Sequence, residues 1–212
     1  MKITVIGASG KAGNLIMTEA INRGHTVTAV VRSKSALTDP AAKTIEKDLF
    51  ALTYADVEDS DVIIDAFGAW TPETLPLHQT SLQYLCDLLS NKPNRLLVVG
   101  GAGSLYIDAS HTTRVMDTPD FPDVFKPLAS NMGKALDALR SRSDVRWTYL
   151  SPAGDFKADG IKSDRYITGG EELTLNAKGE SVISYADYAI AMVDEAENAA
   201  HIGVRFSVVG NY

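Results

Sequence analysis

The chain has 212 residues, of which 45% are hydrophobic and 22% are charged, and its net charge at pH 7 is −7. These values predict one globular domain, residues 1–212, and the acidic balance disfavours nonspecific binding to nucleic acid or to a membrane surface. No apolar run approaches the roughly 20 residues that span a bilayer, and the first predicted strand starts at residue 2, leaving no room for a cleavable signal, so we expect a cytoplasmic protein.

The first predicted element is a strand that leads through a glycine turn into a helix. The β-branched run of residues 2–6 stops at Gly7, and a helical pattern follows from residue 14 to about residue 23. Backbone amides and the positive end of the helix dipole attract phosphate at such a turn, and glycines allow close approach. We expect a dinucleotide pyrophosphate to be held by Gly7, Ser9, Gly10, Lys11, Ala12 and Gly13. The alternative is an α/β domain whose glycine turn is only structural.

A second β-branched run at residues 26–31 completes a βαβ unit of about thirty residues, and the alternation then continues. Helices with apolar stripes are predicted around residues 82–89, 132–139 and 185–193. Strands are predicted at residues 43–48, 61–66, 95–101, 145–150 and 205–209, with a small hairpin at 166–170 and 173–175. This alternation is typical of a parallel sheet covered on both faces. We therefore predict an α/β fold, a Rossmann-type doubly wound parallel sheet in one domain with a small C-terminal substrate lid.

Two irregular segments interrupt this pattern. Residues 102–124 mix Gly, Ser, Thr, Asp and Pro with aromatic residues, and we interpret them as an active-site loop. Residues 154–183 are the natural lid. After the lid, Ser184-x-x-Asp187 resembles a capping box at the start of the last helix.

Cysteine and histidine usage limits the chemistry. The single cysteine, Cys86, excludes an internal disulfide, and its place on an apolar helical stripe predicts a thiol in the core. The four histidines are dispersed without the spacing of metal ligands, so we expect no metal site. They are His25, His78, His111 and His201.

The residues after the second strand indicate which dinucleotide is bound. Ligands lie beyond the carboxyl ends of the strands in open α/β sheets, and NAD-selective proteins place an acidic residue after the second strand. This chain has Arg32, Ser33 and Lys34 there, and Lys11 adds a positive charge in the glycine turn. A guanidinium can bind a 2′-phosphate in bidentate fashion, which favours NADP over NAD. The alternative is that Arg32 is a solvated surface residue.

Small and polar residues also follow the later strands. Asp48 and Leu49 follow the third strand, where the carboxylate could accept a hydrogen bond from the adenine amino group or, equally well, cap a helix. After the fourth strand, small residues would allow close approach to a cofactor ribose. After the fifth and sixth strands, two further short segments would flank the nicotinamide. These three segments contain Phe67, Gly68 and Ala69; Gly100, Gly101 and Ala102; and Ser151 and Pro152.

Together these segments resemble the atypical short-chain dehydrogenases, most closely the NmrA-like group of the NADH-flavin reductase or biliverdin reductase B type. The resemblance covers essentially the whole chain. It rests on Gly7-x-x-Gly10-x-x-Gly13, on Arg32, on Gly100-Gly101-Ala102-Gly103-Ser104, on Trp147-Thr148-x-x-Ser151-Pro152 and on Ile183-Ser184-x-x-Asp187-Tyr188-Ala189. It implies a Rossmann fold and a bound NAD(P), with flavin as a candidate substrate.

The chain departs from the wider superfamily at the proton donor. Typical members carry Tyr-x-x-x-Lys on the helix after the fifth strand, whereas this chain has Ser130-x-x-x-Lys134. Lys134 could reach the nicotinamide ribose or could be a solvated helix lysine. Ser104 and Tyr106 are the nearest candidate donors, with Ser104 bonding loop backbone and Tyr106 packing as their alternatives. Trp70 and His111 are candidates to line the pocket.

The missing tyrosine limits the reaction. Reducing a ketone generates a strongly basic alkoxide that needs a positioned proton donor, whereas reducing a flavin or quinone gives a delocalised anion that water can protonate. The sequence therefore predicts an NADPH-dependent oxidoreductase, monomer or homodimer, whose partner is a planar small-molecule acceptor such as a flavin or quinone, with Ser104 and Lys134 as candidate catalytic residues. The alternative is a non-catalytic redox sensor of NmrA type. A sugar epimerase or dehydratase is disfavoured by the short chain and the missing tyrosine.

Overall fold

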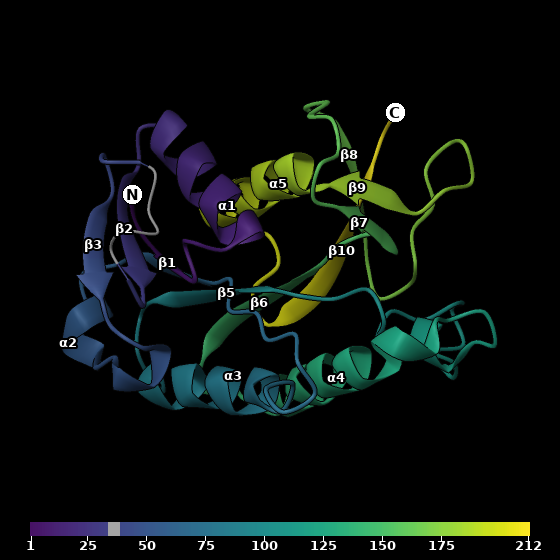
Figure 1. The fold of residues 1–212 in the computed structure, drawn as a ribbon, viewed down its shortest axis with the longest axis horizontal. Helices are drawn as coiled ribbons and strands as arrows, with labels where there is room; N and C mark the ends of the chain where they lie inside the picture. Colours follow the sequence, from purple (N-terminus) through teal and green to yellow (C-terminus); the bar gives the residue numbers. More distant parts are fainter. Residues whose placement is uncertain (34–38) are drawn as a thin grey trace.

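The computed structural model describes residues 1–33 and 39–212, which form an eight-stranded sheet between two layers of helices (Figure 1). The strands of this sheet are β1 (Lys2–Ile6), β2 (Thr26–Val31), β3 (Lys43–Glu46), β4 (Val62–Asp65), β5 (Arg95–Val99), β6 (Arg146–Ser151), β8 (Tyr166–Gly169) and β10 (Val204–Gly210). Their order is β3-β2-β1-β4-β5-β6-β10-β8, and only the β8–β10 pair is antiparallel. The order reverses between β1 and β4, where dinucleotides bind in such sheets.

Two pairs of helices cover the two faces of the sheet. Figure 1 shows α1 (Lys11–Asn22) and α5 (Tyr185–Asn198) on one face, and α3 (Leu77–Leu88) and α4 (Lys126–Arg140) on the other. The short helix α2 (Tyr54–Val57) follows β3. None of the helices in the described part of the chain is both long and apolar enough to span a membrane. This arrangement confirms the predicted doubly wound α/β fold.

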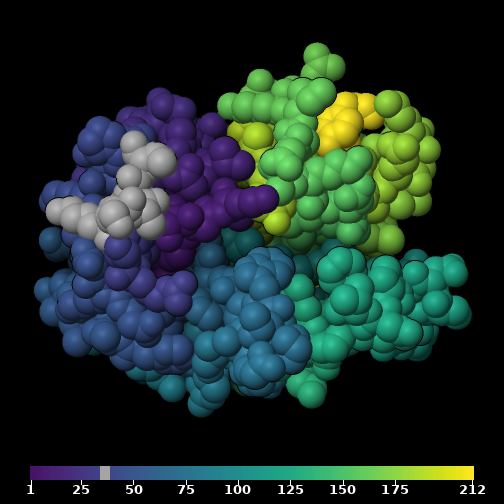
Figure 2. Space-filling view, viewed as in Figure 1, coloured from purple at the N-terminus to yellow at the C-terminus, as the bar shows by residue number. Residues whose placement is uncertain are grey.

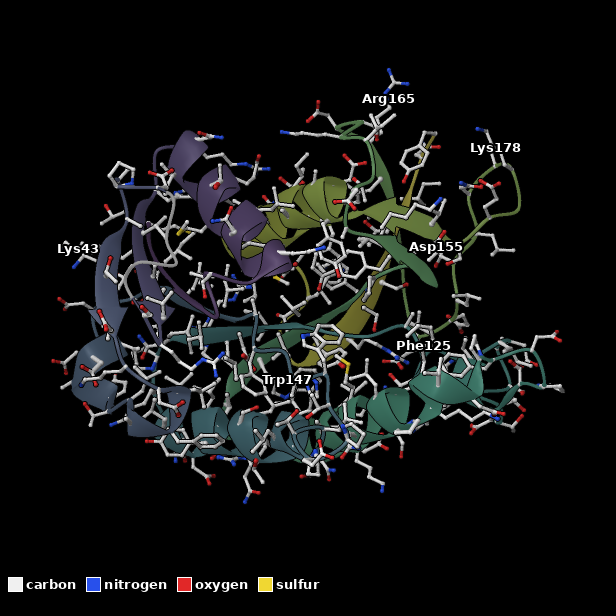
Figure 3. The ribbon with its side chains drawn as sticks, viewed as in Figure 1. Lys43, Phe125, Trp147, Asp155, Arg165 and Lys178 are labelled. Carbon is white, nitrogen blue, oxygen red and sulfur yellow. The ribbon has the colours of Figure 1, made fainter. Side chains whose placement is uncertain are left out.

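Each face of the sheet buries its own hydrophobic core. Alternate residues of a strand point to opposite faces. In β4, Ile64 therefore packs with the α1 and α5 side chains, and Ile63 packs with those of α3 and α4. Cys86 lies in the second core, as predicted, and burial raises the pKa of its thiol to about 12. Trp147, labelled in Figure 3, belongs to the same core.

A buried ion pair joins the start of β5 to the end of α5. The Arg95 guanidinium donates to a Glu195 carboxylate oxygen at 2.7 Å and to the backbone carbonyl oxygens of Glu195 and Ala196. The Glu195 side chain is only 2% exposed and also accepts from the His201 ring at 2.7 Å. The bond to Ala196 satisfies a carbonyl group of the last helical turn, whereas the Glu195 carbonyl also accepts from the Ala199 amide at 3.0 Å.

The predicted hairpin is wrong. The strand at 166–170 exists as β8, but it pairs with β10, and residues 173–175 form no strand. In addition, β7 (Asp155–Lys157) and β9 (Val182–Ser184) form a two-stranded parallel sheet. The lid segment is therefore anchored to the domain by long-range pairings.

Candidate functional site

The turn between β1 and α1 brings three stretches of backbone into contact at the carboxyl edge of the sheet. Gly7 has a φ of +73°, and a Cβ at this position would lie 2.6 Å from the carbonyl oxygen of Ala66. A Cβ at Gly13 would lie 2.3 Å from the carbonyl oxygen of Gly7. Only glycine fits at both positions, so the first turn of α1 lies directly against the turn and against the end of β4.

The N-terminus of α1 presents backbone donors to this edge. Gly10 is its N-cap residue, and among the described residues no side chain caps it. At the start of α5, by contrast, Ser184 Oγ accepts a hydrogen bond from the Asp187 amide at 3.0 Å. Uncapped amides and the positive end of the dipole suit an anionic group, and the predicted residues Ser9, Lys11 and Ala12 lie at this end of the helix. The residues present therefore fit a pyrophosphate.

The predicted 2′-phosphate residue lies at the neighbouring strand end. Arg32 directly follows β2 and is exposed, and Lys34 lies outside the described residues. After β3, Asp48 Oδ1 accepts a hydrogen bond from the Phe50 amide at 2.9 Å and caps the short turn Leu49–Ala51. The structure thus shows the helix-capping alternative for Asp48, and its adenine contact stays a prediction. Leu49 is buried.

Two buried side chains hold the loop that follows β4. Asp65, the last residue of β4, accepts a hydrogen bond on Oδ1 from the Phe67 amide at 3.0 Å. His78 of α3 places Nε2 3.1 Å from the carbonyl oxygen of Ala69. Both side chains lie on the α3 side of the sheet. Their bonds to Phe67 and Ala69 fix the two ends of the loop 67–69, which has Gly68 in its middle. Trp70 follows the loop and is 73% exposed.

The ends of β5 and β6 are tied to each other. Ser151 Oγ donates a hydrogen bond to the carbonyl oxygen of Gly101 at 3.0 Å, and the Gly101 amide donates to the Tyr149 hydroxyl at 3.3 Å. Pro152 follows and is buried. The structure therefore brings the residues predicted to flank a nicotinamide to one place, beside the loop after β4.

A cavity of about 20 Å³, enough for one ordered water molecule, lies beneath these strand ends. It is lined by Asp65, Phe67, His78, Ser81, Leu82, Val98, Val99, Met132, Ala135 and Tyr149. Burial raises the pKa of Asp65 to about 6, although the hydrogen bond from the Phe67 amide acts in the opposite direction. Burial also lowers the pKa of His78 and raises that of Tyr149 to about 12. Figure 2 shows the surface hollowed between the N-terminal residues in purple and the blue-green residues below them.

The predicted active-site loop and lid are joined by a buried arginine. Arg205 of β10 donates a hydrogen bond to Ser104 Oγ at 3.1 Å, and it also donates to the carbonyl and the carboxylate oxygens of Glu171. The amide of Tyr106 donates to the Glu171 carbonyl at 2.9 Å, and the amide of Leu173 donates to the Tyr106 carbonyl at 2.8 Å. Loop 102–124 therefore shares backbone hydrogen bonds with the lid, and Ser104 lies buried at their junction.

The neighbouring aromatic residues belong to the same junction. His111 stacks on Tyr106 with ring centroids 4.6 Å apart, and its Nε2 lies 2.6 Å from a Glu172 carboxylate oxygen. The Tyr106 ring also lies under the Arg205 guanidinium. The Tyr106 ring therefore packs within this junction, while its candidacy as a proton donor stays a prediction, and His111 has a carboxylate partner.

Comparison with known proteins identifies the family. Residues 7–199 match the family described as NAD(P)H-binding. This chain belongs to that family. It is 49% identical over 210 residues to the uncharacterized protein YwnB of Bacillus subtilis, covering 99% of this chain and 98% of YwnB.

Two solved structures are also similar to this NAD(P)H-binding chain. A Streptococcus pneumoniae protein described as "a putative NADH-flavin reductase" has a TM-score of 0.96 and 53% identity, with 100% of both chains covered. A Bacteroides thetaiotaomicron protein described as a "putative epimerase" has a TM-score of 0.86 and 34% identity, covering 100% of this chain and 97% of the other. These names differ in the reaction, so the chemistry must come from the site itself.

Helix α4 lacks the tyrosine typical of the wider superfamily. Its sequence contains Ser130 and Lys134 at the expected spacing and no tyrosine. Lys134 is exposed and lines a groove between α3 and α4 together with Gln83 and Arg142. It does not line the cavity, whereas Met132 does. The predicted catalytic roles of Lys134 and Ser104 stay predictions.

Two buried groups beneath these loops, Asp65 and His78, are not among the site residues predicted from the sequence. Asp65 falls within the predicted strand 61–66, and His78 is one of the four dispersed histidines, so neither stands out in the sequence. A carboxylate at the end of the apolar run Val62–Ile64 was the available signal, because a buried acid is rare unless it has a role. Among the described residues, no group of three His, Cys, Asp or Glu side chains could hold a metal ion.

Proposed function

We propose that this protein is an NADPH-dependent reductase that transfers hydride to a planar acceptor such as a flavin or a quinone. When bound, the cofactor supplies the hydride, and the protein supplies binding, orientation and electrostatics. The choice of acceptor rests on the sequence of α4. In typical relatives this helix provides the tyrosine that acts as the acid, whereas here it has Ser130 at that position. A reaction that avoids a basic alkoxide does not need that acid.

Each part of the carboxyl edge has a role in this proposal. The uncapped N-terminus of α1 and its glycines hold the pyrophosphate, and Arg32 binds the 2′-phosphate. The loop 67–69 and Gly101 hold the ribose and the amide of the nicotinamide half. Ser151 orients Gly101 by its hydrogen bond. Holding the acceptor against the nicotinamide supplies most of the rate enhancement, through proximity.

Support for the reductase activity comes from two sources. The Streptococcus pneumoniae relative, described as "a putative NADH-flavin reductase", is similar over its whole length. Glycines at the ends of β4 and β5, Gly68 and Gly101, also support the proposal, because residues without a side chain would leave room for a flat ring there.

Stopped-flow oxidation of NADPH by FMN, and separately by a quinone, tests the proposal. We expect single-turnover oxidation with at least one acceptor and tighter binding of NADPH than of NADH. Tight binding of NADPH without turnover by either acceptor would overturn the enzymatic part and favour a redox sensor. Lys134→Ala, compared with Ser104→Ala, shows whether either predicted side chain contributes, through kcat at saturating NADPH.

A further inference from the structure

Asp65 is a buried carboxyl at the edge where the cofactor binds. Its side chain lies at the carboxyl end of β4, the residue is 5% exposed, and Oδ1 accepts from the Phe67 amide at 3.0 Å. No lysine or arginine is among the described residues that line its cavity. A buried carboxyl of this kind is costly when ionised, because no cation compensates its charge.

The titratable groups around Asp65 come from two elements. His78 of α3 and Tyr149 of β6 line the same cavity, and Cys86 of α3 senses the Asp65 charge. Burial lowers the pKa of His78 and raises those of Tyr149 and Cys86, so all three favour their neutral forms. Helix α4 contributes Met132 and Ala135, which do not titrate. Asp65 therefore changes charge near pH 6 in this cavity, and His78, whose pKa is lowered by burial, is the neighbouring group whose protonation must be separated from it.

The cavity lies under one half of the dinucleotide site. In a doubly wound sheet the two nucleotides lie on opposite sides of the switch point. Arg32, after β2, marks the adenosine side, so β4, β5 and β6 lie under the nicotinamide side. The two cofactor forms carry the same phosphates, and they differ by one positive charge on the nicotinamide ring.

We infer that Asp65 sets the preference of this site between oxidised and reduced nicotinamide nucleotide, because its ionised carboxylate attracts the cationic ring and its protonated form does not. This inference rests on the proposed cofactor site. The attraction acts through a water-poor region, where charges interact more strongly than in solvent. Thermodynamic linkage then requires that binding of NADP⁺ releases a larger fraction of a proton from Asp65 than binding of NADPH does.

The expected size follows from the linkage. If the cationic ring lowers the pKa of Asp65 by about one unit, NADP⁺ binding releases roughly 0.4 proton at pH 6. The dissociation constant of NADP⁺ relative to that of NADPH then falls about fivefold between pH 5 and pH 8. The 2′-phosphate also titrates near pH 6, but it is common to both nucleotides and cancels in the comparison.

Isothermal titration calorimetry in two buffers of different ionisation enthalpy measures this proton release for each nucleotide. Asp65→Asn is the test variant, because the amide oxygen can still accept from the Phe67 amide. Asp39→Asn is the matched control, since Asp39 Oδ1 also accepts from the amide two residues ahead, that of Ala41 at 2.9 Å, and lies outside the proposed cofactor residues. His78→Gln controls for the neighbouring imidazole. Thermal melts verify that each variant folds. Comparing proton release with the two nucleotides in the wild-type protein tests the inference without any variant.

Proton release with NADP⁺ that exceeds release with NADPH, and that disappears only in Asp65→Asn, supports the inference. Equal proton release with both nucleotides in the wild-type protein overturns it, as does an unchanged difference in Asp65→Asn. If neither nucleotide gives heat at any pH, the proposed function fails and the inference falls with it. Binding of both nucleotides without the difference refutes the inference alone.

Discussion

Replacing Asp65 with asparagine should change how the stability of the fold depends on pH. Burial raises the pKa of this carboxyl from 3.8 to about 6. The folded state therefore binds the proton more tightly than the unfolded chain does, and ionisation of Asp65 opposes folding. Its stabilising contribution is complete below pH 3.8 and is lost as pH rises through about 6. A difference of about two pKa units corresponds to roughly 3 kcal/mol, undiminished by solvent because the side chain is buried.

Urea denaturation from pH 4 to pH 8 measures this effect as a difference between two proteins. We expect the free energy of unfolding of Asp65→Asn, relative to wild type, to increase by about 2.5 kcal/mol between pH 4 and pH 7 and then to level off. Parallel pH profiles for Asp65→Asn and wild type would show that burial does not perturb this carboxyl.

Three further substitutions address the cofactor site and the fold. Arg32→Ala should weaken NADPH binding by about 1.5–3 kcal/mol and NADH binding little, measured by fluorescence titration; equal losses would contradict the 2′-phosphate assignment. Gly13→Ala places a Cβ 2.3 Å from the carbonyl oxygen of Gly7, so we expect a loss of about 1–3 kcal/mol in stability together with weaker NADPH binding, and a variant as stable as wild type would be inconsistent with this contact. Arg95→Met leaves the Glu195 carboxylate without its cation and should cost about 3–5 kcal/mol in chemical denaturation; a loss under 1 kcal/mol would mean that the pair adds little.

The sequence was sufficient to predict the fold because local patterns match the global arrangement. Apolar runs such as Ile3–Ile6 and Leu96–Val99 alternate with helical stripes, and the glycine turn marks the first crossover. The limits of β3 and β5 were each predicted two residues too long at the C-terminal end, since strand ends depend on pairing rather than on composition. Because local preferences agree with the global arrangement, this class of fold could be predicted from the sequence.

Long-range pairing explains what the sequence could not predict. The β-rich segment at 173–175 lies close to β8 along the chain, but β8 pairs with β10 through Thr168 and Val208. The strands β7 and β9 are too short to give a periodic pattern. Ser104 and Arg205 are far apart in the chain, so their hydrogen bond was visible only in the folded structure.

The site residues divide in the same way. The glycine turn and Arg32 are contiguous with their strands, so motif spacing identified them. The cavity is different, because Asp65, His78 and Tyr149 come from β4, α3 and β6, and only folding brings them together. Only one of the two hydrogen bonds of the predicted capping box is present, again because of a long-range contact. Ser184 caps α5, but the Asp187 carboxylate accepts from the Ser163 and Asp164 amides of the lid instead.

The two charged residues of the proposed site should act on different properties of cofactor binding. Arg32 lies on the adenosine side and meets phosphates that both nucleotide forms carry, whereas Asp65 lies on the side of the ring whose charge changes. Separate sites without shared partners give additive free energies. In the Arg32→Ala, Asp65→Asn double variant, we therefore expect both dissociation constants to rise as in Arg32→Ala, while the NADP⁺ to NADPH ratio loses its pH dependence as in Asp65→Asn. Titrations of the four proteins at pH 5 and pH 8 measure this. A ratio that changes in Arg32→Ala alone would show that the two ends of the site are coupled and that charge at Asp65 does not by itself discriminate between the two forms.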